Sequence, residues 1–235
     1  MYQNTYQGDA RVQYFLENIP IKVEKKKIKN MHIYVKPPFG DVLITAPKYI
    51  TDKQIKEFIR ERADWIIENV ERMQEIPVTT YDDGDVISVW GDEYVLEVLE
   101  GTRYSLVLND NTATLTVREG CTQEQKEAFV LEWYRDELKE RVEILLPQWE
   151  EYTGLHCSSW QSKNMKSRWG TCNTKTKKIW LNVKLAERPV ECLEYVILHE
   201  LAHTVVPNHG PEFKAILTRF MPEWKQVKKK LNGKE

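Results

Sequence analysis

The segment HELAHTVVPNHG, from His199 to Gly210, places the strongest constraint on how this chain can fold. His199 and His203 are four residues apart, so on a helix their rings project from the same face. Pro207 cannot continue a helix, and it pushes the residue before it toward an extended conformation. We therefore expect the chain to turn out of the helix there and to return His209 to the other two histidines.

This spacing of histidines is typical of a metal site. Two imidazoles one helical turn apart can bind one tetrahedral ion, with metal–nitrogen distances of about 2.0–2.1 Å. A catalytic zinc site usually has three protein ligands and leaves a fourth position to water, so His199, His203 and His209 are the expected ligands of Zn²⁺. Glu200 lies roughly 100° around the helix from the first ligand. It therefore misses the ion but can reach a metal-bound water as a general base.

The sequence leaves alternatives open at this site. In some HExxH enzymes a glutamate on a later helix is the third ligand, and Glu212 and Glu223 are candidates for that role. Met221 is a candidate for an apolar floor beneath the metal, although ordinary core packing is the commoner role of such a methionine. Two plainer interpretations are a helix whose histidines bind no metal and a structural zinc site in which Glu200 has no part.

The first half of the chain alternates strands with capped helices. Alternating apolar residues predict three early strands, at Ile19–Val23, Met31–Val35 and Asp41–Thr45. A helix follows, with Thr51 and Gln54 at the positions of a capping box. Further short strands lead into a second capping box, formed by Thr122 and Gln125. This recurrence suggests an internal duplication of a ββ(β)α unit.

The last third of the chain has a different composition. Trp160–Trp180 contains six Lys or Arg and no acidic residue. Lys178–Leu185 then predicts a strand, and Val190–His203 predicts a helix that begins just after a proline. We expect an α+β protein with an N-terminal α+β region over residues 1–118 and a second domain over residues 119–235. No Gly/Ser-rich linker separates them, so the two parts should pack closely.

The C-terminal half resembles the YgjP-like family of metal-dependent hydrolases, which is related to the SprT-like zinc peptidases. The resemblance rests on MKSRWGTC (Met165–Cys172), on IWLNVKL with Pro189 after it, on YVILHELAH and on NHGPEF. Together these motifs span residues from about 160 to 224, and their joint order is far more specific than HExxH alone.

The resemblance implies a minimal zincin-like metallopeptidase domain. In such a domain zinc binds to three histidines and a glutamate is the base, which here are His199, His203, His209 and Glu200. The spacing of the third ligand equals that of the metzincins, HExxHxxGxxH, but Val206 stands where they have glycine. A glycine permits a left-handed turn, so we expect the turn here to be built differently, through Pro207.

Three further residues are candidates for substrate binding. In zincins a strand at the border of the cleft pairs with an extended substrate, and Lys178–Leu185 is the natural candidate, although an internal strand without substrate contact is an equally good interpretation. Asn182 could donate to a substrate backbone or stabilise the following turn. Lys166 and Arg168 could hold an anionic group or stabilise an oxyanion, or belong to a solvated basic loop.

The expected function is that of a zinc-dependent hydrolase, first of all a metallopeptidase that acts on peptides or proteins with Glu200 as general base. One alternative is a metal-dependent hydrolase of nucleotide phosphoanhydrides, with Lys166 and Arg168 on phosphate. The lack of a Walker-type glycine loop speaks against it. The other is a nucleic-acid-associated, SprT-like protease, because Trp160, Trp169 and Trp180 are interleaved with cations that could bind a single strand.

Composition narrows the remaining classes. The net charge of −2 gives no overall attraction to nucleic acid or membranes. No apolar run approaches about 18 residues, and the first residues do not resemble a secretory signal, so we expect no membrane partner. The four cysteines are too scattered for a zinc knuckle or a disulfide framework. Reduced thiols, and therefore a cytoplasmic location, are expected.

Overall fold

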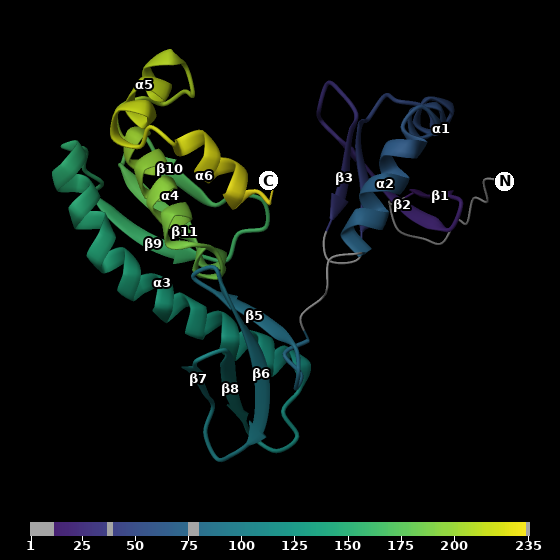
Figure 1. Ribbon diagram of the computed structural model, residues 1–235. Coiled ribbons are helices and arrows are strands. Elements are labelled where there is room, and N and C mark those ends of the chain that lie inside the picture. Colours follow the sequence, from purple (N-terminus) through teal and green to yellow (C-terminus); the bar gives the residue numbers. More distant parts are fainter. Residues whose placement is uncertain (1–11, 37–39, 75–79, 234–235) are drawn as a thin grey trace. The chain divides into compact units, whose positions relative to one another are not determined.

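The chain divides into two compact units, Met1–Val78 and Thr79–Glu235 (Figure 1). The computed structural model describes residues 12–36, 40–74 and 80–233. Both units combine strands with helices, so the expected α+β class is confirmed. None of the helices in the described parts combines the length and the apolar character needed to cross a bilayer.

The first unit is a four-stranded sheet covered on one face by two helices. Its strands are β1 (Val12–Leu16), β2 (Ile19–Lys26), β3 (His32–Lys36) and β4 (Asp41–Pro47). The strand order is β1-β2-β4-β3, in which β2 and β4 are parallel and the outer pairs are antiparallel. Along β2, Ile21 and Val23 are buried whereas Lys22 is exposed, because successive side chains point to opposite faces.

Two helices, α1 (Asp52–Arg60) and α2 (Ala63–Gln74), supply the other half of this core. The predicted capping box is present, since the Thr51 side chain accepts from Gln54 N and the Gln54 side chain accepts from Thr51 N. Ile55 and Ile66, one from each helix, are fully buried against the sheet. The single helix expected after Thr51 is therefore two helices, interrupted at residues 61–62.

The second unit begins with a sheet of the same topology. Its strands are β5 (Val86–Val89), β6 (Asp92–Glu100), β7 (Ser105–Asn109) and β8 (Thr112–Val117), in the order β5-β6-β8-β7. As in the first sheet, the central pair is parallel and the outer pairs are antiparallel. The long helix α3 (Gln123–Thr153) follows, with the predicted capping box of Thr122 and Gln125. The repeated unit is thus four strands followed by a capped helix, which is one or two strands more than the ββ(β)α unit inferred from the sequence.

This second sheet shares one hydrophobic core with the C-terminal elements. Leu115 from β8 and Leu138 from α3 belong to the same buried cluster as the helix that carries the histidines. The turn between β5 and β6 is also tied to the C-terminal part, because Trp90 N donates to Ala186 O (2.8 Å). The division of the chain therefore falls at residues 78 and 79, and it differs from the expected boundary at residues 118 and 119.

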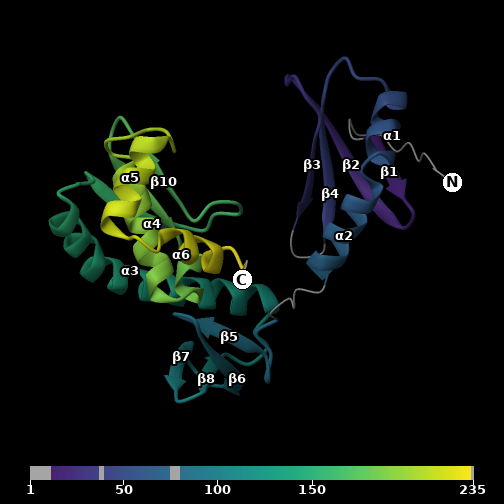
Figure 2. The same ribbon diagram turned by 45° about the horizontal axis from the view of Figure 1, so that its top comes forward.

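The remaining elements surround one buried helix. They are β9 (Ser159–Lys163), β10 (Gly170–Asn173), β11 (Lys178–Asn182), the 3₁₀ helix η1 (Val183–Glu187), α4 (Val190–Ala202), α5 (Pro211–Phe220) and α6 (Trp224–Leu231). Helix α4 contacts α3, α5, α6, β10 and β11 (Figure 2). It is apolar on nearly all sides, as expected of a helix enclosed by other elements. The few polar residues of α4 therefore require an explanation.

The strand order of the small sheet corrects one expectation. The order is β10-β11-β9, so β11 lies between its two neighbours and has no free edge. The prediction that Lys178–Leu185 is a strand at the border of the cleft is wrong. The alternative interpretation, an internal strand of the sheet, is the observed one. The strand with a free edge beside α4 is β10.

Candidate active site

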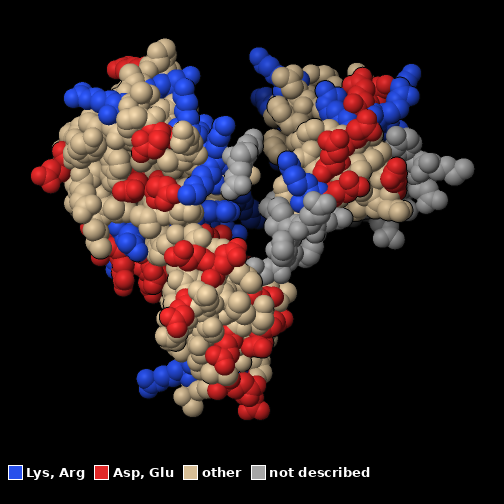
Figure 3. Space-filling model, viewed as in Figure 1, with Lys and Arg blue, Asp and Glu red and all other residues tan. Residues whose placement is uncertain are grey.

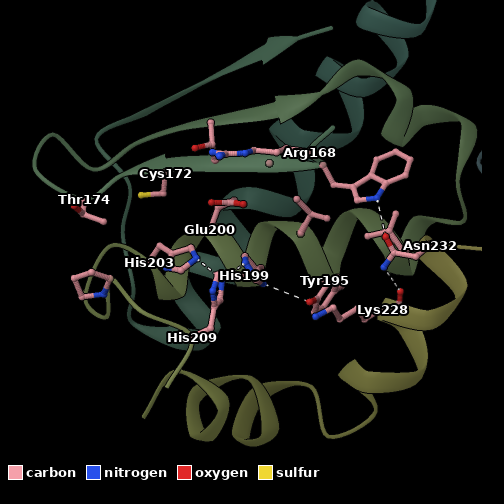
Figure 4. A pocket seen from close by; sticks show the side chains of 16 residues that line it. Arg168, Cys172, Thr174, Tyr195, His199, Glu200, His203, His209, Lys228 and Asn232 are labelled. Carbon is pink, nitrogen blue, oxygen red and sulfur yellow. Dashed lines mark hydrogen bonds between the residues drawn. The ribbon is translucent and has the colours of Figure 1, made fainter. Parts of the chain in front are cut away.

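The three histidines of the HExxH segment converge on one point (Figure 4). His203 Nε2 lies 3.0 Å from His209 Nε2, and His209 Nε2 lies 3.0 Å from His199 Nε2. Their ligand nitrogens all fall within 4.8 Å of one another. Two nitrogens on one tetrahedral zinc, at about 2.0–2.1 Å each, lie about 3.3 Å apart. The observed spacing therefore fits a single ion of this size.

The outer nitrogens of two of these rings have partners that fix ring orientation. His203 Nδ1 lies 3.0 Å from the carbonyl oxygen of Val206, and His199 Nδ1 lies 3.4 Å from the hydroxyl of Tyr195. A carbonyl oxygen accepts only, so His203 carries its proton on Nδ1 in this bond. Its Nε2 lone pair then faces the other histidines, which is the arrangement of a metal-binding imidazole.

The turn that returns His209 is built without glycine. Helix α4 ends with Val205 N and Val206 N both bonded to Ala202 O, at 3.2 and 2.9 Å. Val206 does not adopt a positive φ, and its side chain is buried in the core. The residue that departs from the metzincin pattern therefore anchors the turn by packing, and its carbonyl oxygen orients His203.

The floor of the site is an aromatic ring. The centroid of the Phe213 ring lies 4.8, 4.7 and 4.8 Å from the ring centroids of His199, His203 and His209. Phe213 is 2% exposed, so it excludes water from beneath the three rings. Met221, the candidate for this role, is buried in the general core instead.

Glu200 lies beside the histidines in a buried position. It is 4% exposed, and its Oε2 atom has no hydrogen-bond partner among the residues that the structure describes. Burial raises the pKa of Glu200 to about 8, and the nearby charge of Arg168 acts in the opposite direction. A carboxylate oxygen without a partner in a buried site is a costly arrangement, which is typical of a group kept for chemistry.

The imidazoles of His199 and His203 are held in the neutral form that binds metals. Burial, together with the neighbouring His203 and His209, lowers the pKa of His199 to about 3. Burial also lowers the pKa of His203. Neutral imidazole is the ligand form, so protonation of these two rings does not compete with an ion near neutral pH. The donor set fits a metal ion that prefers nitrogen ligands.

The two alternative ligands lie outside this cluster. Among the described residues, the group whose ligand atoms lie close enough to share an ion consists of the three histidines. Glu212 is exposed in the first turn of α5, and Glu223 is exposed at the N-cap of α6. The geometry therefore favours His209 as the third donor.

A cleft of about 520 Å³ opens above the histidines. One wall is β10 with the residues before it, and the opposite wall is α6. The two walls are linked by Asn232, which accepts from Trp169 Nε1 (3.4 Å) and donates to Lys228 O (2.6 Å). Arg168 and Lys228 line the cleft on opposite sides (Figure 4).

Comparison with models of protein families matches residues 29–234 to the YgjP-like metallopeptidase domain. The chain belongs to the YgjP-like metallopeptidase family. The resemblance found in the C-terminal half is thereby confirmed, and the match also includes most of the first unit. The protein is therefore an enzyme, a metal-dependent hydrolase of the peptidase class.

The YgjP-like chain was also compared with curated proteins and with solved structures. Comparison with curated proteins found no match. The crystal structure of the metallopeptidase zymogen jannalysin of Methanocaldococcus jannaschii is similar to 40% of this chain and to 95% of its own chain. It shares 27% sequence identity with the YgjP-like chain, at a TM-score of 0.36.

Of the three residues predicted to bind substrate, Lys166, Arg168 and Asn182, one lines the cleft of this YgjP-like domain. Arg168 lines the cleft, whereas Lys166 is exposed and does not. Asn182 is 3% exposed, and both polar atoms of its side chain bond to backbone. Its Nδ2 donates to Met165 O (2.8 Å) and Arg168 O (2.7 Å). Asn182 therefore stabilises the loop that carries Arg168. These bonds fit the interpretation of Asn182 as a residue that stabilises backbone turns better than that of a substrate-binding residue.

Sequence reasoning missed four residues that shape this site. They are Gly170, Tyr195, Phe213 and Lys228. Tyr195 could have been found, since it precedes His199 by one helical turn and so shares its face. Phe213 lies in the NHGPEF motif, but its contact with the histidines depends on how α5 folds back. Lys228 reaches the cleft only through the packing of α6 on α4.

Proposed function

We propose that this YgjP-like metallopeptidase hydrolyses peptide bonds with a zinc ion held by His199, His203 and His209 and with Glu200 as general base. The observation that carries the proposal is the convergence of three imidazoles beside a buried carboxylate. A structural zinc site has no need of that carboxylate, so a catalytic role accounts for more of the geometry.

A bound zinc ion supplies a Lewis acid that makes water acidic and polarises a carbonyl group. The chain's own residues then do the rest. Val206 O and the Tyr195 hydroxyl hold two of the rings in place. Phe213 closes the site from below and keeps water out.

Glu200 moves the proton in this proposal. Its Oε2 takes a proton from the attacking water, whose oxygen then bonds to the carbonyl carbon. Glu200 passes that proton to the leaving nitrogen as the carbon–nitrogen bond breaks. The charge of a zinc ion on the histidines would lower the raised pKa of Glu200, so the carboxyl group begins and ends the reaction ionised, and no other acid is required.

The free edge of β10 is the proposed binding place for the peptide backbone. Trp169 O accepts from Asn182 N (2.9 Å), and antiparallel pairing alternates from residue to residue. Gly170 and Cys172 therefore turn their N–H and C=O groups away from β11, and both residues line the cleft. An extended peptide can add to such an edge as a further strand, in a way that tolerates different sequences.

The second candidate function is hydrolysis of a nucleotide phosphoanhydride. The observation in its favour is the pair of cations, Arg168 and Lys228, that lines the cleft. The free edge of β10 favours the peptide instead, because a nucleotide has no backbone that could pair with a strand.

The test compares wild-type protein with the Glu200→Gln variant, which keeps the shape of the side chain but removes the base. Each protein is incubated with unfolded casein and, separately, with a nucleoside triphosphate, and its zinc content is measured. We expect casein cleavage by the wild type, about one zinc per chain in both proteins, and a loss of at least about 10²-fold in the variant. Turnover of the triphosphate without cleavage of casein would replace the proposal by the second candidate.

A further inference from the structure

Two cations in the cleft form no ion pair with a described carboxylate, although the charge of one of them, Arg168, acts on nearby Glu200. The other cation is Lys228. Lys230, on the same helix as Lys228, differs because it pairs with Glu191 at 2.6 Å. Of the described residues that line the cleft, Glu200 alone carries a carboxylate. The cleft therefore has an excess of positive charge even before a cation binds to the histidines.

The positive charge continues beyond the cleft. A second hollow, of about 710 Å³, lies between α5 and α6 and is lined by four lysines, Lys214, Lys225, Lys228 and Lys229. None of its described lining residues is acidic. The two hollows share Lys228 and Asn232, so they are neighbours on one surface. Figure 3 shows Lys and Arg side chains gathered over α6 on this side of the unit. We call these four lysines together with Arg168 the basic track.

The basic track has few exposed aromatic faces on which bases could stack. Trp224 lines the second hollow but is only 8% exposed. Trp169 lines the cleft but is half-buried, and the Arg188 guanidinium lies 5.6 Å from the centre of its ring. Single-stranded nucleic acids are usually held by stacking on open rings beside cations. The free edge of β10, in contrast, offers backbone groups that fit a polypeptide.

We propose that the cleft selects acidic polypeptide segments. Carboxylates of Asp or Glu close to the cleaved bond pair with Arg168 and Lys228, and Lys214, Lys225 and Lys229 attract the acidic residues that follow. The backbone of the same segment pairs with β10. This inference rests on the proposed function, because it assigns the substrate class of that site.

The test measures binding, and it uses the full-length Glu200→Gln protein loaded with zinc so that the probe is not consumed. Two fluorescein-labelled peptides of equal length are compared by anisotropy, one rich in Glu and one with Gln in place of each Glu. We expect the acidic peptide to bind about tenfold more tightly at low salt, with a smaller difference at high salt. Replacing Arg168 or Lys228 by Ala should each weaken binding of the acidic peptide by about two- to fivefold.

Lys163→Ala is the matched control, since Lys163 is exposed on β9 and lines neither hollow. It should leave binding of both peptides unchanged. Equal binding of the acidic and neutral peptides overturns the inference. So does tighter binding of an oligo-dT strand or of a nucleoside triphosphate that depends on the same two cations.

Measuring the hydrolysis of both peptides by the wild-type protein distinguishes a failure of this inference from a failure of the proposed function. Cleavage of both peptides at equal rates supports the proposed function and overturns the acidic preference. Tight binding of the acidic peptide without cleavage supports the charge preference and contradicts the peptidase reaction.

Discussion

Gly170 lies directly against the side chain of Glu200. A Cβ atom placed on Gly170 would lie 2.6 Å from Glu200 Oε1, 2.8 Å from Glu200 Cγ and 2.9 Å from a methyl carbon of Val196. Real Cβ atoms do not approach other atoms so closely, so only glycine lets β10 pass this close to the base. Strand β10, to which the substrate is proposed to bind, and the proposed catalytic carboxylate of Glu200 therefore lie in contact because Gly170 has no side chain.

Gly170→Ala should therefore impair catalysis without removing the metal. The added methyl group pushes Glu200 or β10 aside, and a displacement of about 1 Å can cost about 10²-fold in rate. We expect a fall of about 10–100-fold in kcat/KM for peptide hydrolysis and an unchanged zinc content. Gly210→Ala is the control, because a Cβ there meets no atom within 4 Å. Unaltered activity of Gly170→Ala would show that the contact is not needed.

Phe213→Leu should weaken zinc binding more than it weakens the fold. The ring of Phe213 packs on all three histidines, whereas a leucine leaves part of that floor open. Residues that support metal ligands typically contribute about 10–100-fold to affinity. We expect the Kd for zinc, measured by competition with a chelator, to rise about tenfold. Met221→Leu changes the general core without touching the rings, so it should leave that Kd unchanged.

Asn182→Asp should destabilise the second unit. The carboxylate cannot donate to Met165 O and Arg168 O, and it places a charge in a position that is 3% exposed. Losing both donors in a buried place costs about 2–4 kcal/mol of the free energy of unfolding. Urea denaturation measures this loss. Asn164→Asp, at an exposed position in the loop between β9 and β10, should change the free energy of unfolding by less than about 0.5 kcal/mol.

Glu187 should make the stability of the second unit depend on pH. Burial raises the pKa of Glu187, and Lys184 and Arg188 oppose that effect without cancelling it. The folded state therefore binds the proton more tightly than the unfolded state, whose pKa is near 4.5. The contribution of Glu187 to the free energy of unfolding is complete at pH values below about 4.5. It is lost as the pH rises through the higher pKa of the folded state.

Urea denaturation at about pH 4.5 and about pH 7 tests this dependence with wild type and Glu187→Gln. The wild type should lose more free energy of unfolding than the variant on going to the higher pH, because glutamine carries no proton to lose. The groups that face Glu187 are the same in both proteins, including Tyr81 and Tyr134, so their titration cancels. Equal losses in the two proteins would contradict the assignment.

Local signals in the sequence were sufficient to predict that the three histidines lie close together. The four-residue spacing of His199 and His203 places them on one face of a helix, and Pro207, which cannot continue a helix, follows the turn that returns His209. Both effects act within a few residues, so they survive in the folded protein. The capping boxes at Thr51 and Thr122 were predictable for the same reason.

The rest of the site depends on contacts between distant segments. Lys178–Leu185 has the pattern of a strand, but no local signal in the sequence indicates that β10, and not this strand, lies at the edge of the sheet. Phe213 and Lys228 reach the site because α5 and α6 fold back against α4. The domain boundary was misplaced for a related reason, since β5–β8 look like a repeat of the first sheet but bury their apolar face in the core of the second unit.

Metal content is the most direct test of the central claim that three histidines hold one ion. Wild-type protein, His209→Ala and Glu212→Ala are purified without chelator or nickel affinity, and zinc per chain is measured by elemental analysis. We predict about one zinc per chain in the wild type and in Glu212→Ala, and little or none in His209→Ala. Full zinc in His209→Ala, or loss of zinc in Glu212→Ala, would contradict the three-histidine site.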